Sequence, residues 1–164
     1  MGRDLIQAFA RLAVGIGFLS GVGDRFGLWG PHGAANVSWG DFARFTSYTA
    51  QVNSFMPSGL ALILAVLGTF FEIVFGVALV LGLFTRAAAI GSACLLAIFA
   101  FSMTISLGIK APLDYSVFGD CAAALLLTQW HRFRWSIDDR VARKHEQTPT
   151  NRPVPEGATS PVAS

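Results

Sequence analysis

Two carboxyl side chains, Glu72 and Asp120, could do chemistry because each lies inside a long apolar stretch of the sequence. An ionisable group at the centre of a bilayer costs at least ~2.5–3.5 kcal/mol on insertion scales. Counted at ~1.5 Å per residue from Thr85 and His131, the two carboxyls lie about 20 and 16 Å deep. We predict a proton relay or the polar end of a small-molecule pocket. The alternative is that each carboxyl only hydrogen-bonds between helices.

Small residues accompany the first of these carboxyls. Gly68, Glu72 and Gly76 share one helical face, so we expect Glu72 to face a closely packed neighbouring helix. The pair Gly17 and Gly21 has the small-xxx-small spacing that allows close helix approach. Asp120 lies nearer the end of its stretch, where it could be half-solvated.

A second group of charges surrounds the ends of the apolar stretches. Arg11 interrupts the first stretch, Arg86 lies in a short turn, and Asp138 follows the last stretch. An ion pair near a membrane interface is partly shielded from water and therefore matters more than an exposed one. We predict that Asp138 pairs with one of the two arginines, and Arg11 is the preferred partner.

The two cysteines, Cys94 and Cys121, are isolated within apolar runs, with no C-x-x-C motif and no Cys/His cluster. This pattern argues against a zinc site, an iron–sulfur site and a disulfide scaffold, so we expect no metal. A thiol oxidoreductase with cysteine pairs in its loops is disfavoured because both residues lie deep in their stretches. We interpret them as small buried hydrophobic residues.

The composition shows what positions these residues. Hydrophobic residues make up 53% of the 164 residues and charged residues only 13%, too few to cover a small soluble domain. This excludes extensive disorder and a nucleic-acid-binding domain. The pattern predicts an all-α integral membrane four-helix bundle over residues 1–145, followed by a disordered cytoplasmic tail over 146–164. The predicted spans cover residues 5–23, 59–84, 87–109 and 115–130.

Between the first two spans, residues 24–40 are polar and rich in glycine, which predicts a loop. One set of residues then recurs at helical spacing, namely Phe42, Phe45, Thr49, Val52 and Met56, and polar residues such as Arg44 and Gln51 lie between them. This pattern predicts an amphipathic helix in the headgroup region.

Basic residues predict the orientation in the membrane. One side of the four-span arrangement holds eight of them: Arg3, Arg11, Arg86, Arg132, Arg134, Arg140, Arg143 and Lys144. The other side holds Arg25, Arg44 and Lys110. Cytoplasmic loops carry an excess of Lys and Arg, so we expect both termini in the cytoplasm.

Three segments resemble the DoxX family. The first segment is Arg11–Gly15 with Phe18 and Gly21. The second is Glu72 and Gly76 with Leu81–Ala88. The third is Arg134–Asp138. The second segment contains the family's Thr-Arg turn, and the third is similar to its Ser-Leu-Asp ending. Together the matching segments cover residues 5 to about 140.

The resemblance implies a multi-pass protein of the bacterial inner membrane, related to the small subunit of thiosulfate:quinone oxidoreductase. It therefore implies a membrane subunit of a quinone-linked oxidoreductase system, with lipid and quinone as small-molecule partners. No flavin, haem or metal motif is visible, so we expect no covalently bound cofactor and electrons supplied by a partner subunit. The alternative is a membrane adaptor or a lipid- or small-molecule-binding protein without enzymatic activity. No nucleic-acid partner is expected.

Overall fold

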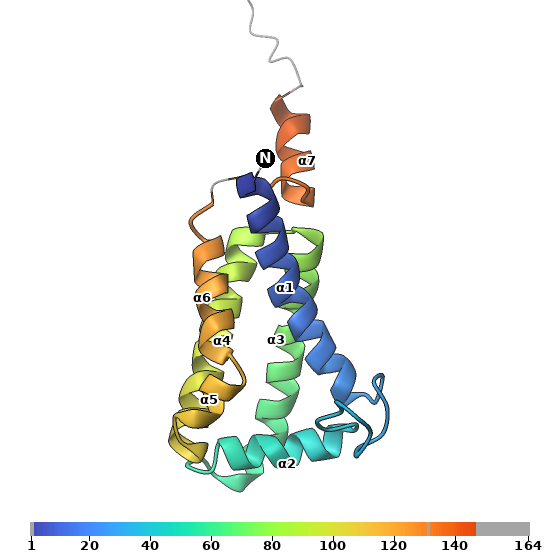
Figure 1. Cartoon of the computed structure of the whole chain (residues 1–164), viewed down its shortest axis with the longest axis vertical. Helices are drawn as coiled ribbons and strands as arrows, with labels where there is room; N and C mark the ends of the chain where they lie inside the picture. Colours follow the sequence, from blue (N-terminus) through green and yellow to red (C-terminus); the bar gives the residue numbers. More distant parts are fainter. Residues whose placement is uncertain (1, 131, 147–164) are drawn as a thin grey trace, which may run out of the picture.

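A computed structural model describes residues 2–130 and 132–146 (Figure 1). In chain order the helices are α1 (Gly2–Arg25), α2 (Phe42–Val52), the 3₁₀ turn η1 (Ser58–Leu60), α3 (Ala61–Leu81), α4 (Thr85–Leu107), α5 (Lys110–Asp114), α6 (Val117–Leu127) and α7 (Ile137–Glu146). No strand occurs among these residues, so the prediction of an all-α fold is confirmed. The tail predicted to be disordered lies outside the described residues, except for Glu146, which ends α7.

Within residues 2–130 and 132–146, three helices are long and apolar enough to cross a membrane: α1, α3 and α4. At ~1.5 Å per residue they rise about 36, 32 and 34 Å, against a hydrocarbon core of about 30 Å. They correspond to the predicted spans 5–23, 59–84 and 87–109. The first helix extends two residues beyond its predicted end, to Arg25.

The fourth predicted span, 115–130, is less regular than expected. Its helix α6 covers only Val117–Leu127, a rise of about 16 Å. Lys110–Asp114, which separates the predicted spans 87–109 and 115–130, forms the short helix α5. Ser116, with a φ of +56°, interrupts the helical backbone between α5 and α6. That this segment crosses the bilayer therefore stays a prediction.

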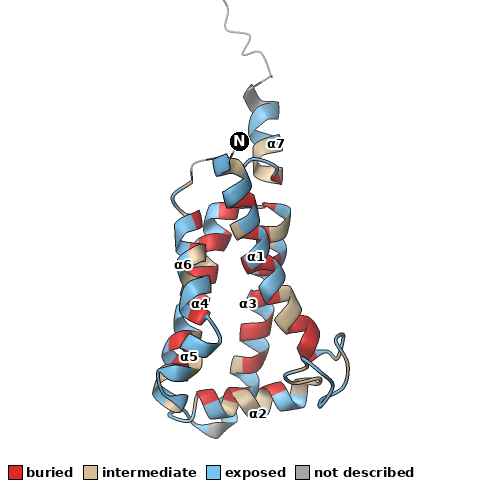
Figure 2. Ribbon diagram, in the orientation of Figure 1, coloured by how far each residue is buried: buried red, intermediate tan, exposed pale blue. Residues whose placement is uncertain are grey.

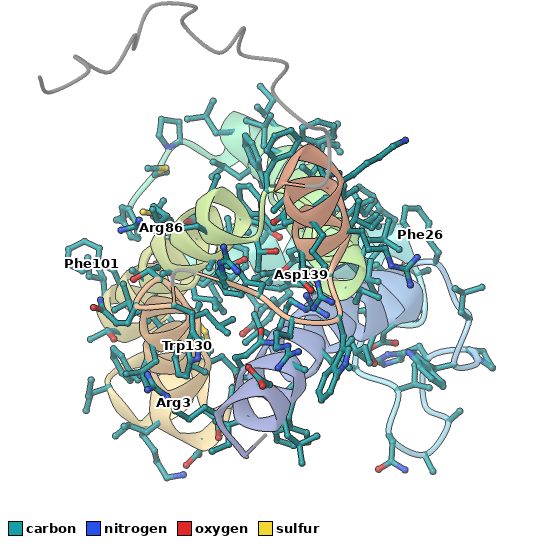
Figure 3. The ribbon with its side chains drawn as sticks, turned by 90° about the horizontal axis from the view of Figure 1, so that it is seen from above. Arg3, Phe26, Arg86, Phe101, Trp130 and Asp139 are labelled. Atoms are coloured by element: carbon teal, nitrogen blue, oxygen red, sulfur yellow. The ribbon has the colours of Figure 1, made fainter. Side chains whose placement is uncertain are left out.

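The side chains are distributed as lipid solvation requires. Buried positions line the inward sides of the long helices, and small residues such as Ala65 and Ala89 are fully enclosed there (Figure 2). Large apolar side chains point outward, among them Phe26 and Phe101 at opposite edges of the bundle (Figure 3). Small residues inside allow the backbones to pack closely, while the apolar exterior suits contact with lipid chains.

Helices α1 and α3 approach each other at Gly15 and Gly76. A Cβ atom on Gly15 would lie 2.9 Å from the carbonyl oxygen of Gly76 and 2.9 Å from a methyl group of Val80. The expectation that another helix approaches closely at Gly17 and Gly21 is wrong, because a Cβ on Gly17 would meet nothing within 4 Å. The predicted glycine face around Glu72 is confirmed at Gly76, which packs against Leu19 and Gly15.

Helix α2 lies across the end of the bundle opposite the N-terminus and α7 (Figure 1). Asp41 begins it by accepting a 2.8 Å hydrogen bond from the backbone N–H of Arg44, and this bond lowers the pKa of Asp41. Phe45, Thr49 and Val52 are buried. The predicted amphipathic helix is therefore present, and its location in the headgroup region remains a prediction.

Two glycine-to-alanine substitutions in α1 test where it crosses α3. Gly15→Ala should destabilise the protein, because the new methyl group has no room between α1 and α3. Gly17→Ala should be neutral or stabilising by up to ~1 kcal/mol, because alanine favours helix more than glycine at an open position. Thermal unfolding in detergent measures both. Equal effects of the two substitutions would contradict the assigned crossing.

Candidate functional site

Glu72 forms a buried ion pair with Arg25, which joins α3 to the last turn of α1. The two residues are 5% and 4% exposed. The Arg25 Nη1 atom also donates a 2.8 Å hydrogen bond to Thr69 Oγ1, one helical turn before Glu72. Glu72 is therefore buried inside the bundle, as its glycine face predicted, but it has a charged partner.

Arg25 is the site residue that sequence reasoning missed. The sequence pattern places Arg25 in the outer loop, because the predicted first span ends at Gly23. Arg25 instead continues the buried stripe of α1 that contains Arg11, Val14, Phe18 and Val22. These positions recur at helical spacing, so extending the stripe by one turn would have indicated that Arg25 faces inward.

Aromatic rings enclose the guanidinium group of Arg25. Its Cζ atom lies 3.7 Å from the ring centre of Phe45 and 5.4 Å from that of Trp39. The two rings meet edge to face, with centres 5.1 Å apart. Cation–π attraction therefore adds to the ion pair and connects α2 and the preceding loop to the α1–α3 interface.

Asp24 positions the loop that supplies Trp39. Its carboxylate accepts hydrogen bonds from the backbone N–H groups of Ser38, Trp39 and Gly40, at 2.9, 3.3 and 3.3 Å. The last two residues of α1 thus have different roles. Asp24 holds the 38–40 loop against the end of the helix, and Arg25 contacts the ring of Trp39 in that loop.

The Arg25–Glu72 pair can form hydrogen bonds and exchange protons with a ligand in apolar surroundings. The Arg25 Nε atom is buried and has no hydrogen-bond partner among the described residues. This N–H group could donate a hydrogen bond to the carbonyl oxygen of a ligand. Glu72 supplies a carboxyl group able to take up or release a proton.

Asp120 does not join this site. It is exposed in the first turn of α6 and, within the described part of the chain, its carboxylate makes no ion pair. Helix α3 packs on α1, α4 and α2, whereas α6 packs mainly on α4 and α1. The two deep carboxyls therefore share no contact, and the structure offers no direct path for a relay between them.

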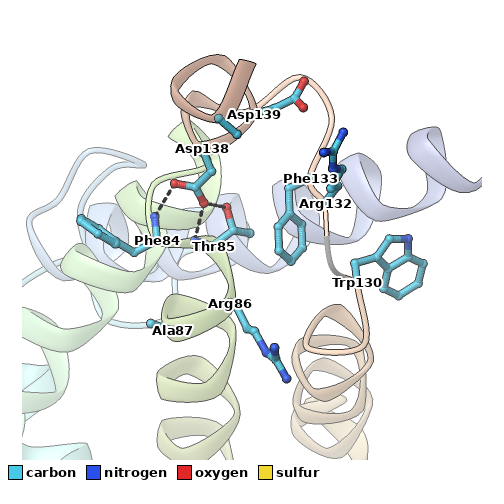
Figure 4. A pocket seen from close by; sticks show the side chains of 10 residues that line it. Phe84, Thr85, Arg86, Ala87, Trp130, Arg132, Phe133, Asp138 and Asp139 are labelled. Carbon is cyan, nitrogen blue, oxygen red and sulfur yellow. Dashed lines mark hydrogen bonds between the residues drawn. The ribbon is translucent and has the colours of Figure 1, made fainter. Parts of the chain in front are cut away.

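Asp138 occupies the opposite end of the bundle, where it caps α4 from a distant part of the chain. Its carboxylate accepts hydrogen bonds from Phe84 N at 2.9 Å and from Thr85 N and Oγ1 at 2.8 Å (Figure 4). Its own N–H donates to the carbonyl of Gly82 at 3.0 Å. The first N–H groups of a helix lack intrahelical partners, so a carboxylate there satisfies them and suits the helix dipole.

Asp138 and Arg11 form no salt bridge, so the predicted close pair is absent, although the charge of Asp138 still acts on Arg11 from a distance. Buried Arg11 instead donates to the carbonyl of Trp135 at 3.1 Å, and Gln7 beside it donates to the carbonyl of Arg134 at 3.0 Å. The physical reason is competition, since three short hydrogen bonds at the start of α4 occupy the carboxylate. Arg11 and Asp138 both hold the 134–138 segment on the bundle, through different contacts.

Arg86 is exposed and borders a groove of about 450 Å³ between the start of α4, the end of α6 and α7 (Figure 4). Trp130, Arg132, Phe133 and Asp139 also line it. Over residues 2–130 and 132–146, no group of three or more His, Cys, Asp and Glu side chains could hold a metal ion.

The cysteines differ from the prediction of small buried residues. Cys94 is exposed on α4 and Cys121 is half-buried on α6, and both are free thiols.

Comparison with known proteins gives one result. The DoxX family profile matches residues 6–105, from the first turns of α1 to the last turn of α4, and this range contains both Arg25 and Glu72. No curated protein and no solved structure matches the chain.

The capping role of Asp138 predicts a contrast with its neighbour. Asp138→Asn should lower stability by about 1–2 kcal/mol, the usual value of a helix cap. Asp139→Asn should cost less than about 0.5 kcal/mol, because Asp139 pairs with exposed Arg143 within α7. Thermal unfolding in detergent compares them, and equal losses would remove the distinction.

Arg25→Gln should destabilise the protein by about 3–5 kcal/mol, because it leaves the buried charge of Glu72 without its partner. The double variant Arg25→Gln/Glu72→Gln should recover at least half of that loss, since no charge then remains buried. Arg44→Gln, which breaks an exposed pair with Asp41, is the control and should cost less than about 1 kcal/mol. Denaturant unfolding in mixed micelles measures all three. A double variant as unstable as Arg25→Gln would contradict the ion-pair account.

Proposed function

Since the chain belongs to the DoxX family, and is a multi-pass membrane protein, we propose that it is the membrane subunit of a quinone-linked oxidoreductase system. Its quinone site is centred on Arg25 and Glu72. The observation that supports this most is the buried Arg25–Glu72 pair itself, which puts a hydrogen-bond donor and a proton-exchanging group in an apolar bundle.

The residues around the pair fit a quinone head group. Arg25 Nε is a buried donor without a hydrogen-bond partner among the described residues, and a quinone carbonyl would satisfy it. The rings of Trp39 and Phe45 beside Arg25 offer an aromatic surface. When bound, a quinone accepts two electrons and two protons to become a quinol. In this proposal Arg25 orients the head group, and Glu72 holds a proton and transfers it at its carboxylate.

The electrons come from a partner subunit, because no flavin, haem or metal motif is visible in the sequence. The protein lies in the bacterial inner membrane with both termini in the cytoplasm. The excess of Arg and Lys near the start of α1, at the start of α4 and in the 132–144 segment supports this orientation. Asp120 is an exposed carboxyl that could exchange protons nearer the membrane surface.

A second candidate function is lipid or small-molecule binding without redox chemistry. The groove beside Arg86, Arg132 and Trp130 favours it, because cationic and aromatic side chains meet there at one end of the bundle.

Quinone binding tests the first function directly. A benzoquinone with a decyl tail, titrated into protein in lipid nanodiscs, should quench tryptophan fluorescence in a saturable way. Trp39→Phe should remove most of the quench, because the Trp39 ring lies 5.4 Å from the Arg25 guanidinium carbon. In a deletion strain, the wild-type gene should restore the quinol-to-quinone ratio of extracted membranes, and Glu72→Gln should not, because an amide does not titrate in this range.

The double variant Arg25→Gln/Glu72→Gln separates function from folding, since it keeps amides at both positions and no buried charge. It should fold, fail to bind quinone and fail to complement. Asp114→Asn, at an exposed pair with Lys110, is the matched control and should behave as wild type. Full complementation by Glu72→Gln would reject the proton-transfer role and favour the binding function.

A further inference from the structure

Cys121 on α6 lies against α4, the helix that contains Cys94. The thiol of Cys121 donates a 3.4 Å hydrogen bond to the carbonyl oxygen of Ala93. That oxygen belongs to the peptide unit that joins Ala93 to Cys94. Two residues separated by 27 positions in the chain are therefore brought close in space.

Helix packing holds the two positions together. Helices α4 and α6 form one of the two most extensive helix contacts of the described structure. Fully buried Ala124 lies one turn beyond Cys121, and Ala93 itself is buried. The backbones around both cysteines are therefore close, and packing holds the two helices together at this level.

Cys94 faces outward from the bundle. It belongs to a stripe on α4 with Ile90, Ile98 and Phe101, which are 49%, 60% and 67% exposed. Because α4 is a candidate membrane span, this stripe faces lipid. A reagent that reaches Cys94 must therefore be soluble in the hydrocarbon region, as quinones are.

We propose that Cys94 and Cys121 form a redox-active dithiol that delivers electrons to a membrane quinone. In this step the two S–H bonds break and one S–S bond forms, releasing two electrons and two protons. The quinone takes up both electrons and both protons and becomes a quinol, so the step balances. The inference rests on the proposed quinone-linked function for its oxidant, and it adds a carrier within the chain that passes the partner subunit's electrons to the quinone.

The experiment uses purified wild-type protein in lipid nanodiscs without oxygen, with a fully substituted decyl benzoquinone that cannot add a thiol to its ring. Absorbance follows quinol formation. Alkylation of the denatured protein counts free thiols, and mass spectrometry of a non-reduced digest identifies linked peptides. The expected result is one quinol per chain, loss of both free thiols and a Cys94–Cys121 peptide from a single chain.

Cys94→Ser and Cys121→Ser should each abolish quinol formation while leaving the melting temperature within a few degrees of wild type. Free thiols that persist beside oxidised quinone would overturn the proposal, as would disulfides between chains. Copper phenanthroline provides a separate check on geometry: if it too fails to link the two residues, their approach is too distant for a disulfide.

Tryptophan quenching in the same samples keeps this inference distinct from the proposed function. Saturable quenching with unreacted thiols would reject the dithiol and leave the quinone site standing. Absence of quenching together with unreacted thiols would reject both.

Discussion

Lipid cannot solvate a charge, so every charged side chain inside this bundle must find its partner within the protein, and Glu72 finds it in Arg25. The pair connects α1 to α3 near the end where α2 crosses. Because Arg25 also contacts Phe45 and Trp39, the same guanidinium group orients α2 and its preceding loop. The arrangement of that whole end follows from satisfying one buried carboxylate.

The opposite end obeys the same constraint with different groups. The start of α4 has no capping side chain of its own, and Asp138 supplies one from beyond the last apolar helix. Gln7 and Arg11, both buried in α1, donate to backbone carbonyls of residues 134 and 135. Backbone groups that would otherwise be unsatisfied thus bind the 134–138 segment to α1 and α4.

Between these two polar ends, the central part of the bundle consists of small residues inside and apolar side chains facing the lipid. Gly15 and Gly76 bring α1 and α3 together there, which places Arg25 within reach of Glu72 at the end of the same interface. The quinone-linked function that we propose draws on both features, because a polar donor and a titrating group are useful to an apolar ligand only where water is excluded. Cys94 and Cys121 lie on the other helix pair, α4 and α6, with Cys94 facing the lipid.

The amino-acid sequence alone determined the membrane class, the all-α fold, the amphipathic helix after Asp41 and the burial of Glu72, because these depend on composition and on periodicity along one helix. It did not determine which side chains meet across helices. Arg25 looked like a loop charge, Gly17 looked like a packing residue, and Asp138 looked like an ion-pair partner of Arg11. Only the tertiary structure decided these contacts, because they depend on the rotation and crossing point of one helix against another, and a difference of one turn changes which residues face each other.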